Sequence, residues 1–216
     1  MMMMRKSVVL VVALVVVFFV TGGVAGASMI ISGSDIVAST ELPALSVPPV
    51  GTFSIEQIAD GITSDISPFN GFGSTSSSGT ITLDLVSDYN LESFLLWNDI
   101  NVFEEGIKDF SLVFFDGADA LIPLTFSAEF SAPLGQLAEA EFIFAEVVLG
   151  VSRVDLVVLN SHPYFHNRIE IREVAFTGTV IPEPNTALLL GFGLLGLGVK
   201  RRRPRGTPHS VDGRVS

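Results

Sequence analysis

Apolar and polar residues alternate with a period of two through the middle of the chain. The clearest examples are segments 80–85, 153–156 and 168–171, in which β-branched residues are frequent. This pattern predicts β-strands that bury one face. We expect further strands near residues 29–31, 91–97, 110–115, 121–132 and 141–148, and a single helical turn within residues 55–60.

Proline and glycine residues separate these segments, at positions 43, 48–49, 71, 117, 133 and 163. No segment between them has a helical apolar stripe of useful length. About seven to nine short strands at this spacing predict an all-β fold, an antiparallel β-sandwich.

The alternation slips once near the end of this region. Ile169 and Ile171 share one phase, whereas Val174 and Phe176 share the opposite phase. A β-bulge between residues 171 and 174 accounts for the slip, since a bulge inserts one residue and re-aims its neighbours. We expect the bulge to turn Glu173 toward an edge or a loop.

The N-terminal residues have the order of a secretory signal peptide. Arg5 and Lys6 precede an apolar run of 13 residues, 8–20, and Ala25 and Ala27 form a small-residue cleavage site. Cleavage before Ser28 is expected, after export by a Sec-type pathway. Residues 1–27 are therefore interpreted as a signal helix that is absent from the mature fold.

A second apolar run lies near the C-terminus. The motif Pro182-Glu183-Pro184 precedes the 13-residue run 187–199, which five Lys and Arg residues follow at 200–203 and 205. A helix of this length spans about 20 Å, less than the ~30 Å hydrocarbon core of a membrane. The basic cluster would stay inside and leave the motif outside. An ordinary single-pass anchor with a basic flank is the alternative.

The order of motif, short apolar helix and basic cluster resembles the PEP-CTERM sorting domain of Gram-negative bacteria. The resemblance implies processing by an integral-membrane exosortase, transient residence in the inner membrane, and a final place at the cell surface or outside the cell. The predicted domains are a signal peptide (1–27), a β-sandwich ectodomain (28–180), a sorting signal (181–205) and a disordered tail (206–216).

The predicted ectodomain is strongly acidic. Residues 28–180 contain 21 Asp and Glu residues but only four bases, so their formal charge is −17. Such a surface repels nucleic acid and anionic lipid and favours cations and neutral glycans. The chain has no cysteine, so no disulfide supports the fold.

A second resemblance covers most of residues 54–179. The segments Ile58-Ala59-Asp60-Gly61, 81–85, 95–98 and 168–178 are similar, in this order, to the galactose-binding-like (discoidin, or factor 5/8 type C) domain. That family implies an eight-stranded jelly roll, found in lectins and carbohydrate-binding modules. It also implies a structural Ca²⁺ held by Asp60 and Glu173, with Thr63, Ser64 and Asp65 as further candidate ligands.

The chemistry of these residues agrees with calcium, a hard cation that takes six to eight oxygen ligands. A solvated acidic turn is the alternative. For a glycan site, residues Tyr164, His166, Asn167 and Arg168 offer an aromatic ring beside hydrogen-bonding groups.

Catalytic motifs are scarce. There is no cysteine nucleophile, and the only histidines of the ectodomain, His162 and His166, belong to one loop. We therefore expect a non-catalytic binding or matrix module associated with carbohydrate or exopolysaccharide. The alternative is a polysaccharide-active enzyme on a β-sandwich, which requires two carboxylates across a cleft at about 5 to 9.5 Å.

Overall fold

The computed structural model describes residues 27–47, 51–63, 71–98, 106–134, 139–163 and 168–182, and the folded unit that contains the strands ends at Ile181. The described residues form ten strands and two short 3-10 helices, in the order β1 (Met29–Ile31), η1 (Gly33–Asp35), β2 (Ile36–Thr40), β3 (Ser46–Val47), β4 (Gly51–Thr52), η2 (Ile55–Ala59), β5 (Phe72–Ser74), β6 (Gly79–Asn98), β7 (Ile107–Phe115), β8 (Glu129–Ser131), β9 (Ala140–Ser161) and β10 (Ile169–Val180).

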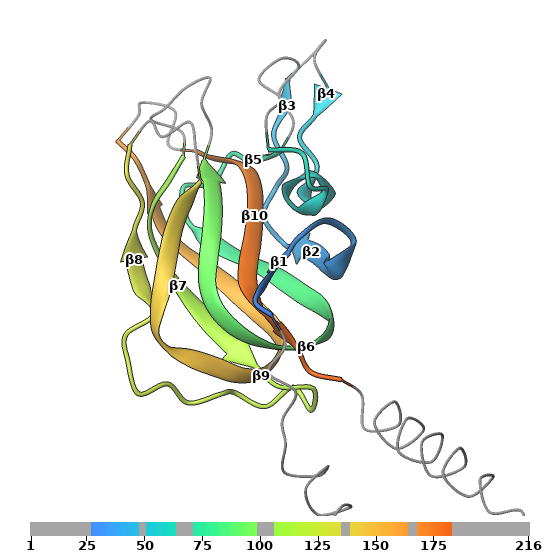
Figure 1. The fold of residues 1–216 in the computed structure, drawn as a ribbon. Helices are drawn as coiled ribbons and strands as arrows, with labels where there is room; N and C mark the ends of the chain where they lie inside the picture. The colour runs from blue at the N-terminus through green and yellow to red at the C-terminus, as the bar shows by residue number, and fades with distance from the viewer. Residues whose placement is uncertain are drawn as a thin grey trace, which may run out of the picture. The chain divides into compact units, whose positions relative to one another are not determined.

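All strand pairs are antiparallel, which confirms the predicted all-β sandwich. One eight-stranded sheet has the order β1-β10-β6-β9-β7-β8, with β2 added to β6 and β5 added to β10, while β3 and β4 pair separately. β6 and β9 are 20 and 22 residues long and curve strongly in Figure 1. The first half of β6 pairs with the second half of β9, and the reverse, so both strands contribute to both layers.

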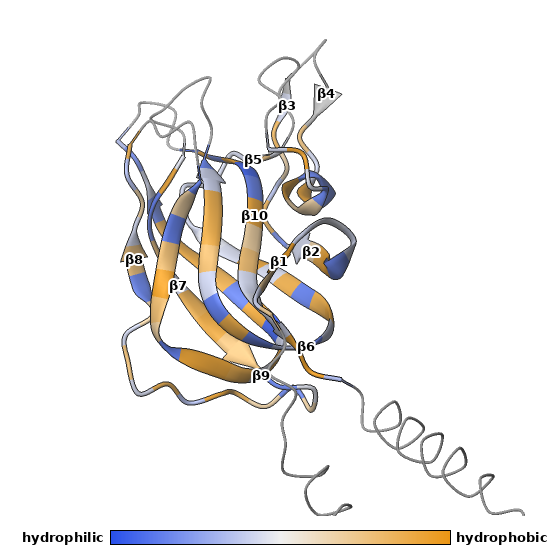
Figure 2. Ribbon diagram, in the orientation of Figure 1, coloured by the Kyte–Doolittle hydropathy of each residue, from blue (hydrophilic) through white to orange (hydrophobic). Residues whose placement is uncertain are grey.

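The two long strands correct the expectation of shorter, separate ones. The segments 80–85 and 91–97 are one strand, as are 141–148 and 153–156. Alternation is lost where these strands bend, because residues 86–88 and 145–147 are all exposed there. Register shifts accompany both places, and Gly150 takes φ 71° just beyond the second. Elsewhere the strands show the alternating bands of hydropathy seen in Figure 2.

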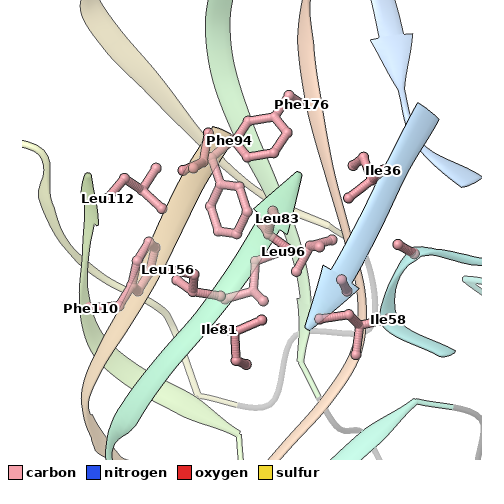
Figure 3. Close-up of a cluster of buried hydrophobic side chains, with 14 of the residues drawn as sticks. Ile36, Ile58, Ile81, Leu83, Phe94, Leu96, Phe110, Leu112, Leu156 and Phe176 are labelled. Atoms are coloured by element: carbon pink, nitrogen blue, oxygen red, sulfur yellow. The ribbon is translucent and has the colours of Figure 1, made fainter. Parts of the chain in front are cut away.

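Phenylalanine side chains join the two layers of the core (Figure 3). Phe94 lies with its ring centroid 5.6 Å from that of Phe110 on β7 and 5.3 Å from that of Phe176 on β10. All three side chains are fully buried. Burying one such side chain contributes about 1.5 to 3 kcal/mol, so this cluster is a major source of stability.

The strands define two ends of the sandwich. At the end that we call the loop end, β6 finishes opposite the start of β10, with Asn98 paired to Ile171, and β7 starts opposite the end of β9, with Ile107 paired to Ser161. At the opposite end, which we call the exit end, β1 begins beside the last residues of β10, with Met29 paired to Gly178.

The structure confirms the predicted helical turn, confirms the strand at 121–132 only in part, and does not describe the two predicted terminal helices. The helical turn is confirmed as η2, which a Ser54–Gln57 capping box closes at its start. Of segment 121–132, only Glu129–Ser131 forms a strand. Pro123 has no N–H to donate to a neighbouring strand, which disfavours a strand there. The side chains of Ile122, Leu124 and Phe126 still pack on the core. The predicted signal helix, except its last residue Ala27, and the short helix at 187–199 lie outside the described residues. Within the described residues, no helix has the length and apolar character to span a membrane.

Candidate functional site

A β-bulge in β10 brings Glu173 to the first loop. The register of β10 against β6 shifts between Ile171 and Glu173, as the phase slip in the sequence predicted. The Glu173 carboxylate accepts a hydrogen bond from the backbone N–H of Gly61, with 3.1 Å between nitrogen and Oε1. The bulge therefore ties the last strand to a loop that is 112 residues away in the sequence.

Helix η2 holds the loop side of this contact. Ile58 and Ala59 are buried in the core, which fixes the helix against the sheet. Asp60 ends the helix, and its Oδ1 accepts a hydrogen bond from the N–H of Ile62 at 2.8 Å. Gly61 takes φ 83°, a conformation that side chains other than that of glycine rarely adopt. The Asp-Gly pair thus turns the chain so that the Gly61 N–H faces Glu173.

Glu173 is strongly perturbed. Its side chain is only 1% exposed, and its Oε2 is buried and accepts no hydrogen bond from the described residues, while the Asp60 side chain lies close enough to share a proton with this carboxyl group. Burial raises the pKa of Glu173 to about 8; the Gly61 N–H opposes the shift and the charge of Asp60 adds to it. A buried carboxylate with one oxygen unpaired, beside a second carboxylate, is an incomplete arrangement.

An oxygen-binding cation fits this arrangement. Hard cations such as Ca²⁺ prefer carboxylate and carbonyl oxygens, and a cation would give the buried Oε2 a partner. Among the described residues, no group of three or more His, Cys, Asp or Glu side chains could hold a metal. Among the described residues, Asp60 and Glu173 would therefore be joined as ligands by carbonyl or hydroxyl oxygens or by water.

The other predicted ligands divide into two groups. Thr63 follows the Asp60 turn and is partly exposed. Ser64 and Asp65 lie outside the described residues. The structure therefore brings together Asp60 and Glu173, while the place of Asp65 stays a prediction.

Most of the predicted glycan-binding residues, Tyr164, His166 and Asn167, also lie outside the described residues. Arg168 is described, and its Nε lies 3.3 Å from Oε1 of Glu170 in an ion pair. The segment that contains them leaves β9 and returns to β10 at the loop end. The strand residues that flank it, Ser161 of β9 and Ile169 of β10, lie at the end of the sandwich that Glu173 adjoins.

Sequence analysis missed the residues that order this end. Asn98 bridges the start of β7, because its amide donates to the Ile107 carbonyl at 2.8 Å and accepts from the Ile107 N–H at 2.9 Å. A Cβ at Gly106 would lie 2.8 Å from Cγ of Asn98, so the close packing requires glycine. The N–H of His162 donates to the Gly106 carbonyl at 3.1 Å. An Asn followed by Gly106 eight residues later is the only hint in the sequence.

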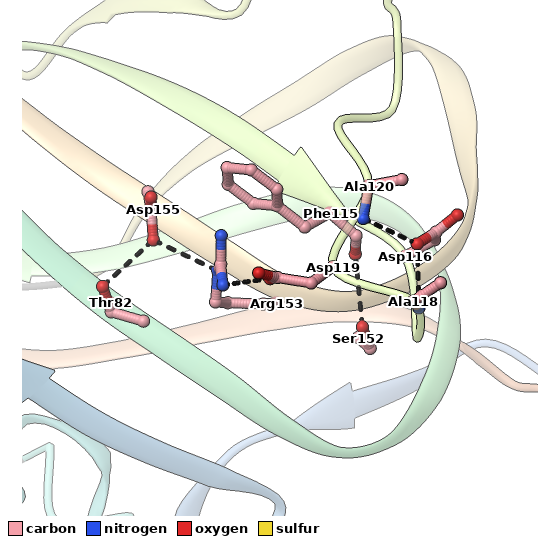
Figure 4. Close-up of polar contacts among 9 residues, drawn as sticks. All are labelled: Thr82, Phe115, Asp116, Ala118, Asp119, Ala120, Ser152, Arg153 and Asp155. Atoms are coloured by element: carbon pink, nitrogen blue, oxygen red, sulfur yellow. Dashed lines mark hydrogen bonds and ion pairs between the residues drawn. The ribbon is translucent and has the colours of Figure 1, made fainter.

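A separate polar cluster lies at the exit end (Figure 4). The Arg153 guanidinium stacks on the Phe115 ring at 3.8 Å from its centroid and pairs with Asp119 and, at 3.6 Å, with Asp155. Thr82 donates to Asp155 at 3.0 Å. The charge of Arg153 is thus matched within the protein, so this cluster joins β6, β9 and the turn after β7 and offers no free cation to a ligand.

Comparison with known proteins identifies a sorting motif near the C-terminus and, as described below, a shared fold. Residues 180–203 match the PEP-CTERM protein-sorting motif. No curated protein sequence matches the chain. The PEP-CTERM motif implies that the protein is exported and sorted to the surface of a bacterium.

Several solved carbohydrate-binding modules share the fold. The family 32 module of NanJ from Clostridium perfringens, solved with galactose, is 12% identical with a TM-score of 0.50, covering 69% of this chain and 98% of the module. A Clostridium perfringens family 32 module solved with GalNAc-β-1,3-galactose is 14% identical with a TM-score of 0.53, covering 68% and 99%. The C-terminal domain of a chitobiase from Bacteroides fragilis is 14% identical with a TM-score of 0.54, covering 71% and 100%.

These likenesses define the class of protein by its fold. The sandwich has the galactose-binding-like, discoidin-type architecture of the family 32 carbohydrate-binding modules. It is joined to a PEP-CTERM sorting motif in the same chain.

Proposed function

We propose that this protein is an exported, non-catalytic carbohydrate-binding module that an exosortase-type enzyme sorts to the envelope, or out of the cell, of a Gram-negative bacterium. There it would associate with extracellular polysaccharide or glycan. The observation that carries this proposal is the presence, in one chain, of the sorting motif and of a fold that glycan-binding modules share.

Charge and composition agree with a neutral glycan as partner. The ectodomain has a formal charge of −17, which disfavours nucleic acid and anionic polymers. We propose that Tyr164 provides the aromatic platform and that His166, Asn167 and Arg168 donate hydrogen bonds to sugar hydroxyls. Their segment connects strands at the loop end, away from the exit end where the sorting motif begins.

The alternative, a polysaccharide-active enzyme, finds less support. The carboxylates that meet at the candidate site are Asp60 and Glu173, and Glu173 is too buried to protonate a glycosidic oxygen. The described residues also line a groove of about 210 Å³ between segments 122–126 and 146–149, but Glu146 is its single carboxylate. A glycosidase needs two carboxylates that both reach the substrate.

We further propose that Ca²⁺ binds between Asp60 and Glu173 and stabilises the fold. The ion would neutralise the two carboxylates and clamp the first loop to β10. Its support is the buried, unpartnered Oε2 of Glu173 beside a second carboxylate. Asp65 would be a further ligand from the same loop.

A glycan array tests the binding function. We expect full-length protein in detergent to bind neutral glycans, and Tyr164→Ala or Arg168→Ala to lose at least tenfold in affinity. Val86→Ala is the matched control, because Val86 is 62% exposed and lies on the bend of β6, away from the loop end. Failure to bind any glycan, or equal binding by all three variants, would contradict the proposal.

A second experiment tests sorting. Replacing Pro182, Glu183 and Pro184 by alanine should leave a membrane-retained precursor, while cleavage after Ala27 proceeds normally. The mature mass and the cell fraction report the result. A variant with wild-type mass and location would show that the motif is not used.

A further inference from the structure

The last strand of the sandwich and the sorting motif share residues. β10 extends to Val180, and the PEP-CTERM match begins at residue 180. Beyond the strand, the N–H of Ile181 donates to the Asp88 carbonyl at 2.8 Å. The next residue is Pro182, the first of the Pro-Glu-Pro triplet. No spacer therefore separates the fold from the motif.

The sequence explains why pairing ends at this point. Pro182 has no N–H to donate to a ladder, and a proline keeps the residue before it extended, which suits Ile181 as a continuation of β10. β1 pairs with β10 only as far as Gly178. Within the part of the chain that the structure describes, β6 is therefore the one strand that pairs with Thr179, Val180 and Ile181, through Asn90, Tyr89 and the bond to Asp88.

On the other side of the motif, only Asn185 and Thr186 precede the apolar run at residue 187. The five residues 182–186 reach at most about 17 Å when fully extended. Suppose that an enzyme groove binds the triplet as an extended peptide together with one residue before it. The hydrogen bond between Ile181 and Asp88 must then break, because Ile181 is that residue.

We propose that the folded sandwich withholds the sorting motif, and that the Asp88–Ile181 pair must open before a processing enzyme can bind Pro182-Glu183-Pro184. This inference rests on the proposed function, in which the motif is processed. Strand ends open locally at low free-energy cost. The apparent affinity of the enzyme for its substrate is then reduced by the fraction of chains that are open.

A reversible lock tests the proposal in the full-length protein, expressed in a cell that carries the processing enzyme. Asp88 and Ile181 are the next positions in the register after Tyr89 and Val180, so Asp88→Cys with Ile181→Cys places two thiols on facing residues. The chain has no other cysteine. We expect the oxidised double variant to be processed at least tenfold more slowly than wild type, and reductant to restore the rate.

The matched control is Asp88→Cys alone, which should be processed like wild type with and without oxidant. The reduced double variant is the reference rate for the change at Ile181, so that only the oxidised and reduced forms of the same chain are compared at that position. Processing of the oxidised protein at the wild-type rate would overturn the inference and leave the proposed function intact. If wild type itself is never cut at the motif, the proposed function fails, which is a distinguishable result.

A spacer gives an independent test. Six Gly and Ser residues inserted between Thr179 and Val180 keep residues 180–203 in order but free them from β6, and we expect processing to become several-fold faster. The same six residues between Thr186 and Ala187 serve as the control for length and should not accelerate it. An unchanged rate after the first insertion would overturn the proposal. So would a slower rate, which would mean that the enzyme binds the folded end itself.

Discussion

The two ends of the sandwich treat charge in opposite ways. At the exit end, Arg153 is paired with Asp119 and Asp155 and stacks on Phe115, so the positive charge of Arg153 is compensated within the protein. Near the loop end, the Glu173 carboxyl group is buried beside Asp60, and burial raises its pKa to about 8, so that it holds a proton at neutral pH when no ion is bound. The comparison teaches that buried charge alone does not mark a ligand site. The mark is a buried acidic group whose ionised form the protein disfavours, because a bound cation would restore that form.

The largest expected effect is that of calcium on thermal stability. An ion that binds only the folded state stabilises it by about 2.7 kcal/mol at a hundred times Kd. For ~150 residues this corresponds to roughly 5 to 10 °C in Tm. Calorimetric scans in millimolar calcium and in EDTA should differ by this amount, and Asp60→Ala and Glu173→Ala should each remove most of the difference. Equal Tm values for wild type in both buffers would show that the loop end binds no calcium, and the proposed difference between the two ends would then fail.

The next effect is a pH dependence without calcium. Because the folded pKa of Glu173 is about 8 and its ordinary value is 4.5, the folded state binds more protons than the unfolded state between these pH values. Stability in EDTA should therefore fall as the pH rises from about 5 to 8, by about 2 kcal/mol after allowance for partial hydration. Urea unfolding at several pH values measures it. Glu173→Gln should flatten the profile, and a slope that persists in this variant would assign the titration to another group.

A smaller loss is expected from the exit end. Arg153→Met keeps the apolar stem over Phe115 but removes the cation that pairs with Asp119 and Asp155, which should cost about 1 to 2 kcal/mol although Thr82 still donates to Asp155. The size of the calcium effect should not change, because the cluster is independent of Glu173. Chemical unfolding with and without calcium measures both quantities. A reduced calcium effect in Arg153→Met would mean that the two ends are coupled.

The smallest effect comes from a pair of glycines. Gly61 and Gly150 have φ values of 83° and 71°, and no atom lies within 4 Å of a Cβ built on either. Alanine at either position should therefore cost only backbone strain, about 1 kcal/mol. Only Gly61→Ala should also weaken calcium binding, since its N–H orients Glu173. Titration of both variants with calcium checks this, and equal affinities would contradict the proposed role of the Asp60-Gly61 turn.

Much of the fold could be predicted because burial on one face leaves a period of two in the sequence. The same reasoning located the bulge, since the phase slip between Ile171 and Val174 has few other causes. At the bends within β6 and β9 neither face is buried and the alternation stops, so the pattern predicts two strands where the structure has one. β2 (Ile36–Thr40) and β5 (Phe72–Ser74) were missed. β5 is buried at all three residues, so it has no alternation to detect.

The candidate site could be predicted only in part. Asp60 and Glu173 followed from the resemblance and the bulge, and the structure places them together. The unpartnered state of Oε2 could not be predicted, since it depends on how η2 and β10 pack around the carboxylate. The contacts that compensate the charge of Arg153 could not be predicted either. Its partners Asp119 and Phe115 come from a turn and a neighbouring strand, which only the fold brings together.

The most direct test of the account is calcium binding by wild type and by Glu173→Gln, measured by isothermal titration calorimetry and native mass spectrometry. Gln keeps the size of the side chain and its bond from Gly61 but removes the charge. We predict one Ca²⁺ per wild-type chain and none in the variant, which should fold without the ion. Wild type that binds no calcium, or a variant that binds it with the same affinity, would contradict the claim that Glu173 is a ligand of a cation site.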